Sequence, residues 1–283
     1  MAERNIKLTL AYDGTDFVGW QLQKKGRTVQ GVMQEGLAQL HGHPVRVVAA
    51  GRTDSGVHAT GQVANFMSDI DSIAPERFRE AVNAYLPRDV RVVASNEVGP
   101  RFHSRRSARL RVYRYYTVCG PVLLPHVRNF RHWVRRTLDF ARLNEMASVL
   151  LGEHDFTCFS AEGDANVSKV RRILESAFQV EGDTLVYTVA ATAFLWRMVR
   201  TIMGTFLMLE EQGLGAREMR LIMESGARSN AGATAPARGL FLERVMYDDA
   251  EETVPLHHLE DAEPPGGLAD DGIFPRTFPP GGG

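Results

Sequence analysis

Alternating and helical hydrophobic patterns follow one another along the first hundred residues. Residues 6–14 alternate as a strand, with Ile6, Leu8 and Leu10 on one face. Apolar residues at helical spacing predict a helix after Thr28, its N-cap, which ends before Gly42. Similar patterns predict strands at 45–50, 61–68 and 89–98 and a helix at 75–87. This order of strands and helices is typical of an α+β unit.

The second half of the chain repeats this order without visible sequence identity. Its pattern predicts a strand at 108–119, a helix at 139–151, paired strands at 170–180 and 184–191, helices at 194–212 and 215–226, and a strand at 240–247. We therefore expect an α+β protein with two halves, residues 1–105 and 106–247. Clefts between such halves are common places for a binding site.

Charge divides the chain differently. From Asp248 onward there are nine acidic residues and one basic residue, Arg276, among many prolines and glycines, so residues 248–283 are expected to be a disordered tail. Residues 1–247 keep 32 basic and 25 acidic residues. No apolar run approaches the roughly 18 residues that a membrane span needs. The two cysteines, Cys119 and Cys158, stand far apart, which favours a reduced, cytoplasmic protein.

Much of the positive charge lies in one segment. Between Arg101 and Leu138 there are ten arginines and no acidic residue, with aromatic residues interleaved. Arginine on phosphate and aromatic rings on bases are the usual means of holding single-stranded or loop RNA. The alternative is a solvated charged face, but such faces normally mix both signs of charge, so the segment predicts a polyanion-binding surface.

The glycine-rich stretch "AGRTDSGVHATGQVANF" (50–66) holds the first candidate for chemistry. Asp54 follows a predicted strand within a turn, a common location for catalytic groups. An isolated aspartate there could equally serve the turn alone. Arg52 is close enough to favour the charged carboxylate. His58 could act as an acid or base near neutral pH, or only hydrogen-bond the turn.

A second candidate lies in "FLWRMVRTIMG" (194–204). On a helical wheel apolar residues cover most of the circumference, so the predicted helix is largely buried. Arg200 lies on the remaining stripe and needs a partner, because an unpaired buried charge is very costly. We expect it to pair with Asp54; a core ion pair without chemistry fits the pattern equally well. Gly204 leaves space for another segment, and Arg197 is expected at the surface.

Several collinear motifs resemble the tRNA pseudouridine synthase A family. The aspartate loop is similar to the family signature G-R-T-D-x-G-V-H, and the resemblance covers nearly all of residues 5–247. Further matching blocks are "AYDGTDFVGWQ" (11–21), "TVQG" (28–31), "NAYLPRDVRV" (83–92), "FHSRRSARLRVYRYY" (102–116), "LLGEHDFTCF" (150–159), "FLWRMVRTIMG" (194–204) and "TAPARGLFL" (234–242).

The resemblance implies a role for individual residues. Asp54 would be the catalytic aspartate and Tyr113 would stack on the target base. Arg200 would pair with Asp54, and Arg52 would line the site. The substrate-binding set is completed by His58, Arg105 and Arg106. The sequence departs from the family at Trp196 and Arg197, where we expect an effect on substrate contacts at most.

The resemblance also implies a fold, an activity and partners. The fold would be two ferredoxin-like halves with mixed, mainly antiparallel sheets that join across a basic cleft. The activity would be isomerisation of uridine to pseudouridine at positions 38–40 of the tRNA anticodon stem–loop, by a homodimer without cofactor or metal. The sequence itself contains no nucleotide-binding glycine motif and no metal-ligand spacing. A non-catalytic tRNA-binding protein or RNA chaperone on the same fold is the alternative.

Overall fold

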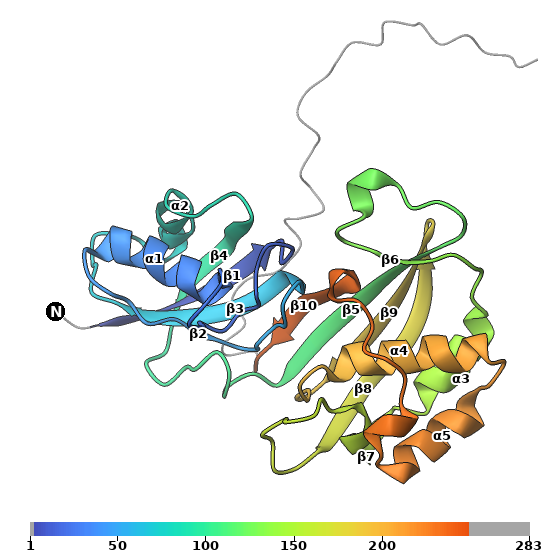
Figure 1. Cartoon of the computed structure of the whole chain (residues 1–283). Coiled ribbons are helices and arrows are strands. Elements are labelled where there is room, and N and C mark those ends of the chain that lie inside the picture. Colours follow the sequence, from blue (N-terminus) through green and yellow to red (C-terminus); the bar gives the residue numbers. More distant parts are fainter. Residues whose placement is uncertain (1–2, 249–283) are drawn as a thin grey trace, which may run out of the picture. The chain divides into compact units, whose positions relative to one another are not determined.

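A computed structural model describes residues 3–248 of the chain, and one mixed sheet organises them (Figure 1). Its order is β4-β1-β3-β10-β5-β9-β8-β7, with β2 paired to β3 and β6 to β5. The strands are β1 (Arg4–Tyr12), β2 (Val48–Ala49), β3 (His58–Ser68), β4 (Val90–Val98), β5 (Leu110–Cys119), β6 (His132–Val134), β7 (Gly152–Asp155), β8 (Val170–Glu181), β9 (Thr184–Ala191) and β10 (Leu240–Met246). Most neighbours are antiparallel, so the predicted α+β class with mainly antiparallel pairing is confirmed.

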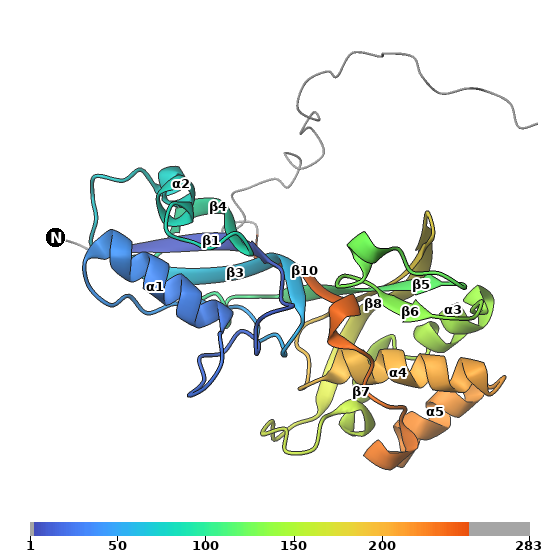
Figure 2. The ribbon, with the colours of Figure 1, turned by 45° about the horizontal axis from the view of Figure 1, so that its top comes forward.

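Helices cover the sheet in each half (Figure 2). They are α1 (Val29–His41), α2 (Phe78–Asn83), α3 (Phe140–Ser148), α4 (Met198–Glu211) and α5 (Ala216–Ser225). As predicted, the Thr28 side chain caps α1 by accepting from the Gly31 N–H, and Gly42 ends the helix with φ +75°. In the second half Phe206 of α4 packs on Tyr187 and Phe178, with ring centroids 5.1 and 5.2 Å away. Such contacts fix α4 against the strands.

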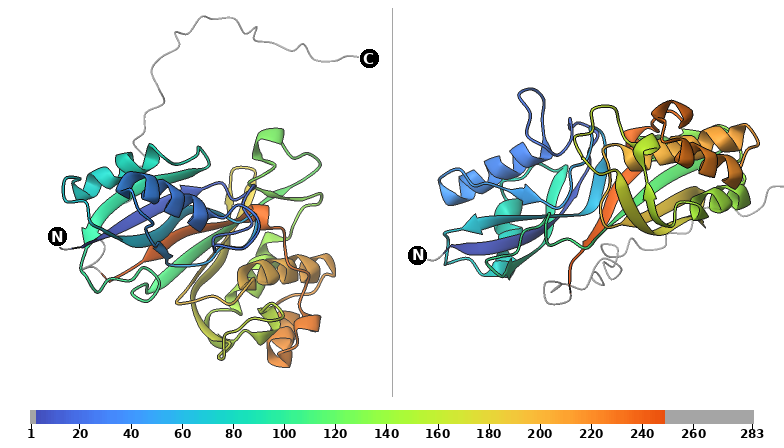
Figure 3. Two further views of the ribbon diagram at one scale, coloured as in Figure 1. Left: turned by 60° about the vertical axis from the view of Figure 1, so that its left-hand side comes forward. Right: turned by 90° about the horizontal axis from the view of Figure 1, so that it is seen from below.

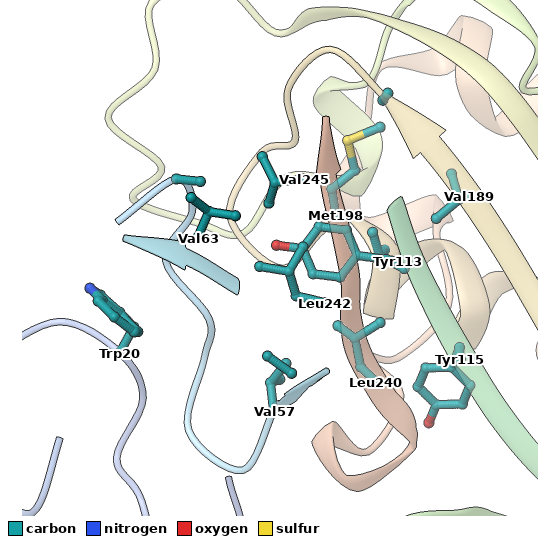
Figure 4. Close-up of a cluster of buried hydrophobic side chains, with 14 of the residues drawn as sticks. Trp20, Val57, Val63, Tyr113, Tyr115, Val189, Met198, Leu240, Leu242 and Val245 are labelled. Atoms are coloured by element: carbon teal, nitrogen blue, oxygen red, sulfur yellow. The ribbon is translucent and has the colours of Figure 1, made fainter. Parts of the chain in front are cut away.

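The last described strand, β10, joins the two halves. It lies between β3, to which it is parallel, and β5, to which it is antiparallel (Figure 3). Gly61 of β3 makes this approach possible, because a Cβ there would lie 2.1 Å from the Glu243 carbonyl oxygen. Leu240, Leu242 and Val245 of β10 are buried in the shared core (Figure 4). The sheet is thus continuous; the division at residue 105 stays a prediction.

Several predicted elements have different bounds in the structure. The strand expected at 45–50 is reduced to Val48–Ala49, and the helix expected at 75–87 is a 3-10 turn followed by the short α2. The helix expected from residue 194 begins only at Met198, because Arg197 adopts a left-handed conformation with φ +61°. The short strands β6 and β7 were not predicted. The acidic tail lies outside the described residues, apart from Asp248.

His58 is a structural residue, and its burial argues against the predicted contact with substrate. Its side chain is fully buried, and its ring stacks on that of Phe241 with the two ring centroids 4.6 Å apart. The Gly14 N–H donates to Nδ1 at 3.0 Å, and Nε2 lies 3.0 Å from the Asn129 carbonyl oxygen. Burial lowers the pKa of His58 from its ordinary 6.5, although Asp13, 3.2 Å from Nδ1, acts in the opposite direction. The folded protein therefore favours the neutral ring.

This burial predicts that acid destabilises the fold through His58. The unfolded chain binds a proton below about pH 6.5 that the folded ring resists, so stability falls as the pH drops below that value. Urea unfolding at pH 7.5 and 5.5 should show this loss in the wild type. In His58→Gln the difference should shrink, by at most about 1.4 kcal/mol per pH unit. The acid-induced loss of stability that remains in His58→Gln is expected to come partly from His132, because burial lowers the pKa of His132 to about 4.

His43→Gln is the matched control. The pKa of His43 is raised, mainly by its hydrogen bond to Asp69, so its removal should leave the acid loss undiminished. An equal pH difference in wild type and His58→Gln would contradict the assignment.

Candidate active site

A pocket of about 710 Å³ lies where the loop at 50–57, β5 and the segment before α4 meet. It is within the size range of small-molecule sites. Its lining includes five of the predicted site residues: Arg52, Asp54, Arg105, Tyr113 and Arg200. The structure therefore brings together residues that the sequence places far apart.

The Asp54 loop is held from below by the segment that follows β1. Asp54 forms an isolated antiparallel bridge with Gly19. The Trp20 N–H donates to the Thr53 carbonyl oxygen at 3.0 Å, and the Tyr12 hydroxyl lies 2.9 Å from Thr53 Oγ1. Residues 11–21 thus hold the aspartate loop in place. This contact is a physical reason why the two motifs occur together in one sequence.

The predicted pair of Asp54 and Arg200 is present. Arg200 Nη1 donates to Asp54 Oδ2 at 3.0 Å, and the two side chains are 15% and 18% exposed. Arg200 is itself held, because its Nε donates to the Ala235 carbonyl oxygen at 2.8 Å. Gly204, one turn later, makes room for this segment: a Cβ there would lie 1.7 Å from the Ala233 carbonyl oxygen. The pair is therefore built by a helix and a strand-end loop from opposite halves.

Trp196 completes the environment of the carboxylate, and its contact with Asp54 was not expected from the sequence, which indicated at most an effect on substrate contacts. Its Nε1–H donates to Asp54 Oδ1 at 3.1 Å. The helical wheel placed Trp196 on a buried face, but α4 begins two residues later and the residue is 46% exposed. Arg197 is exposed, as predicted, with its guanidinium 4.9 Å from the Trp196 ring centroid. No hydrophobic pattern could have revealed a residue outside the helix.

Tyr113 forms a buried wall of the pocket. Its ring packs edge to face on Phe194, with centroids 5.0 Å apart, and lies beside Leu242 of β10 (Figure 4). Gly51 lies opposite its hydroxyl group: a Cβ added at Gly51 would lie 3.7 Å from the hydroxyl oxygen of Tyr113. Burial raises the pKa of Tyr113, and the nearby Tyr12 and Asp54 raise it further. The phenol is therefore neutral and can act as a hydrogen-bond donor.

The remaining predicted arginines differ in position. Arg52 and Arg105 are exposed and line the pocket. Arg106 is exposed but lines a second hollow with Arg101 and His103. Arg52 and Arg105 therefore present positive charge in the pocket lining, and Arg101 and Arg106 present it in the second hollow.

Several other arginines of the 101–136 segment are bound within the protein. Arg114 pairs with Glu181, Arg136 with Glu210 and Arg109 with Asp248. Arg111 lines the pocket but donates to four carbonyl oxygens, those of Ala50, Arg105, Ala108 and Thr192. The acidic partners come from distant parts of the chain, so the charge of this segment is partly neutralised in the fold.

None of the helices within residues 3–248 is long and apolar enough to cross a membrane. That part of the chain also holds no group of three or more His, Cys, Asp or Glu side chains arranged to bind a metal ion.

Comparison with known proteins identifies the family. A family model described as tRNA pseudouridine synthase matches residues 9–105 and 146–248. A tRNA pseudouridine synthase A from Treponema denticola is 46% identical over 252 residues, which are 87% of this chain and 94% of the relative. Proteins of the same name from Shouchella clausii and Acetivibrio thermocellus are 43% and 40% identical, over 84% and 86% of this chain and 91% and 100% of their own lengths. The chain therefore belongs to the tRNA pseudouridine synthase family.

Proposed function

We propose that this protein converts uridine to pseudouridine at positions 38–40 of the tRNA anticodon stem–loop, with Asp54 as the catalytic residue. As a family member it is an isomerase that acts on tRNA. The observation that carries the assignment of Asp54 is its ion pair with Arg200 on the wall of a pocket that Arg52 and Arg105 also line.

The pocket contains a second carboxylate, Asp164, and its environment distinguishes the two. The Asp164 side chain is 1% exposed and pairs with Lys169 at 3.2 Å. It also accepts from the backbone N–H groups of Asn166 and Trp196, at 2.8 and 2.7 Å. Asp54 has one donor on each oxygen and is 18% exposed. Asp54 is therefore the carboxylate that a ligand can reach.

The reaction needs one charged carboxylate at the sugar. The N1–C1′ bond breaks, C1′ of the ribose is rejoined to C5 of the same uracil, and the C5 proton is lost while N1 gains a proton. Asp54 can start this as a nucleophile at C1′ or as a base at the C2′ proton. Both routes use an ionised oxygen, and the Arg200 guanidinium stabilises that charge. Water must stay out, since it would hydrolyse the glycosidic bond.

The target uridine has to leave the RNA stack before it can reach Asp54. Unstacking costs a few kcal/mol, which contacts in the pocket must offset. Tyr113 provides an aromatic wall with a neutral hydroxyl, and Arg52 provides a charge at the pocket edge. Phosphate contacts by Arg101, Arg105 and Arg106 would supply much of the affinity.

The remaining parts of the proposal rest on the family resemblance. We expect a homodimer that acts in the cytoplasm, where its tRNA substrate is found, and a reaction that uses no cofactor.

Asp54→Asn removes the charge that both routes require, so tritium release from tRNA carrying 5-tritiated uridine should fall by roughly 10³-fold or more. Binding of tRNA should change by less than about threefold, because the arginines are untouched. Asp16→Asn, at an exposed aspartate outside the pocket lining, is the matched control and should keep the wild-type rate.

The outcome separates the candidate functions. Wild-type tritium release by Asp54→Asn would remove Asp54 from the chemistry. A wild-type protein that binds tRNA without releasing tritium would be the RNA-binding or chaperone alternative. Free uracil or broken strands would indicate a glycosidase or nuclease.

Binding of tRNA by this protein should weaken as the salt concentration rises. A plot of the logarithm of tRNA affinity against the logarithm of salt concentration has a slope of about −0.7 per neutralised phosphate on a single strand. Replacing Arg101, Arg105 and Arg106 together by Gln should make that slope shallower by about two. The matched control replaces Arg79, Arg217 and Arg220 together by Gln. These residues are exposed and outside the pocket lining, so the variant removes the same number of positive charges away from the pocket. Equal slopes for the two triple variants would exclude the 101–106 segment from the RNA surface.

A further inference from the structure

Trp196 forms hydrogen bonds to two carboxylates, that of Asp54 and that of the buried Asp164. Its side chain donates to Asp54 Oδ1 at 3.1 Å, opposite the Arg200 contact on Oδ2. Its backbone is held twice, since its N–H donates to Asp164 Oδ2 at 2.7 Å and its carbonyl oxygen accepts from the Ala161 N–H at 3.0 Å. A partly exposed tryptophan with a fixed backbone at this position needs an explanation beyond packing.

The carboxylate plane is the property that such a contact would control. Rotation about the last torsion of an aspartate is soft, with broad preferences. A single donor, Arg200 Nη1 on Oδ2, leaves this rotation poorly restrained. A second donor on Oδ1, from a residue outside α4, fixes the plane from both sides. Small errors in the orientation of a reacting group lower the rate strongly, so this restraint has a direct effect on the reaction.

Asp164 is the element that holds Trp196 in place. Burial opposes its charge, but the backbone N–H groups of Asn166 and Trp196, the Asn166 side chain and Lys169 outweigh burial and lower the pKa of Asp164. The carboxylate is therefore a stable acceptor for the Trp196 N–H.

Arg197 adds a conformational constraint on the other side of Trp196. Among the residues that the structure describes, it is the one residue other than glycine with a positive φ, +61°. Such conformations are costly for an arginine and cluster at functional sites. The chain accepts this strain directly between Trp196 and the first turn of α4, which carries Arg200.

We propose that Trp196 is a positioning residue, whose indole N–H sets the orientation of the Asp54 carboxylate together with Arg200, and that Asp164 anchors it. The inference rests on the proposed function, because orientation matters only if Asp54 reacts. It assigns to Trp196 an effect on turnover rather than on tRNA affinity.

The test uses two substitutions that separate the donor from the ring. Trp196→Phe keeps an aromatic ring and removes the N–H. Trp196→His restores a donor, because Nε2 of histidine stands two bonds from Cγ in a five-membered ring, like Nε1 of tryptophan. We expect Trp196→Phe to lower kcat for tritium release about tenfold, and Trp196→His to stay within about threefold of wild type. The tRNA Kd should change by less than about twofold in both.

Tyr187→Phe is the control for a lost hydrogen bond elsewhere. Tyr187 is buried in the same half, outside the pocket lining, and its hydroxyl bonds Ser176 at 2.9 Å. This variant should lose stability but keep kcat. Thermal unfolding of every variant checks that the protein is folded at the assay temperature.

The possible results are distinct. Wild-type kcat in Trp196→Phe, or equal losses in Trp196→Phe and Trp196→His, would overturn the proposal, since the N–H would then not matter. A rise in Kd or KM with unchanged kcat would instead make Trp196 a base-contacting residue and also overturn it. Asp54→Asn is measured in parallel. If Asp54→Asn is active, the proposed function is wrong. If Asp54→Asn is inactive and Trp196→Phe is fully active, only the positioning role of Trp196 is wrong.

Discussion

The ion pair between Asp54 and Arg200 is the interaction on which the site depends. Its partners are 146 residues apart in sequence: Asp54 lies in the loop between β2 and β3, and Arg200 lies on α4. Both are mostly buried, and neither could be placed there alone without a large desolvation cost. The pair requires β10 to lie between β3 and β5, and it requires the 231–235 segment to pack closely on Gly204. The same contacts therefore build both the fold and the site.

The parts of the structure that sequence could predict are those governed by local pattern or by the cost of burying charge. The alternation of Ile6, Leu8 and Leu10 gives β1, and Thr28 and Gly42 bound α1. The argument for a partner of Arg200 needed only a helical wheel and the price of an unpaired charge. The contact at Gly204 followed from the same wheel. The roles of Asp54, Tyr113 and Arg52 came instead from the family resemblance, and they remain proposals.

The parts that sequence could not predict depend on long-range contacts or on backbone strain. The strand at 240–246 has an ordinary pattern, which does not reveal that it inserts between the halves. The left-handed Arg197 delays the start of α4 to Met198, so Trp196 lies outside the helix, where its indole N–H donates to Asp54. The acid-free segment at 101–138 looked uniformly basic, yet Glu181, Glu210 and Asp248 neutralise three of its arginines. His58 was a candidate because a histidine in a polar loop can act as an acid or base near neutral pH, but the fold buries its side chain.

The rate of tritium release by Arg200→Gln, measured below its melting temperature with saturating tRNA, shows whether the ion pair supports catalysis or only the fold. If the pair supports the reactive charge of Asp54, the rate should fall by about 100-fold or more while the tRNA Kd stays within about threefold. A rate within a few-fold of wild type would show that the ion pair only holds the fold together, and the account of this site would be wrong.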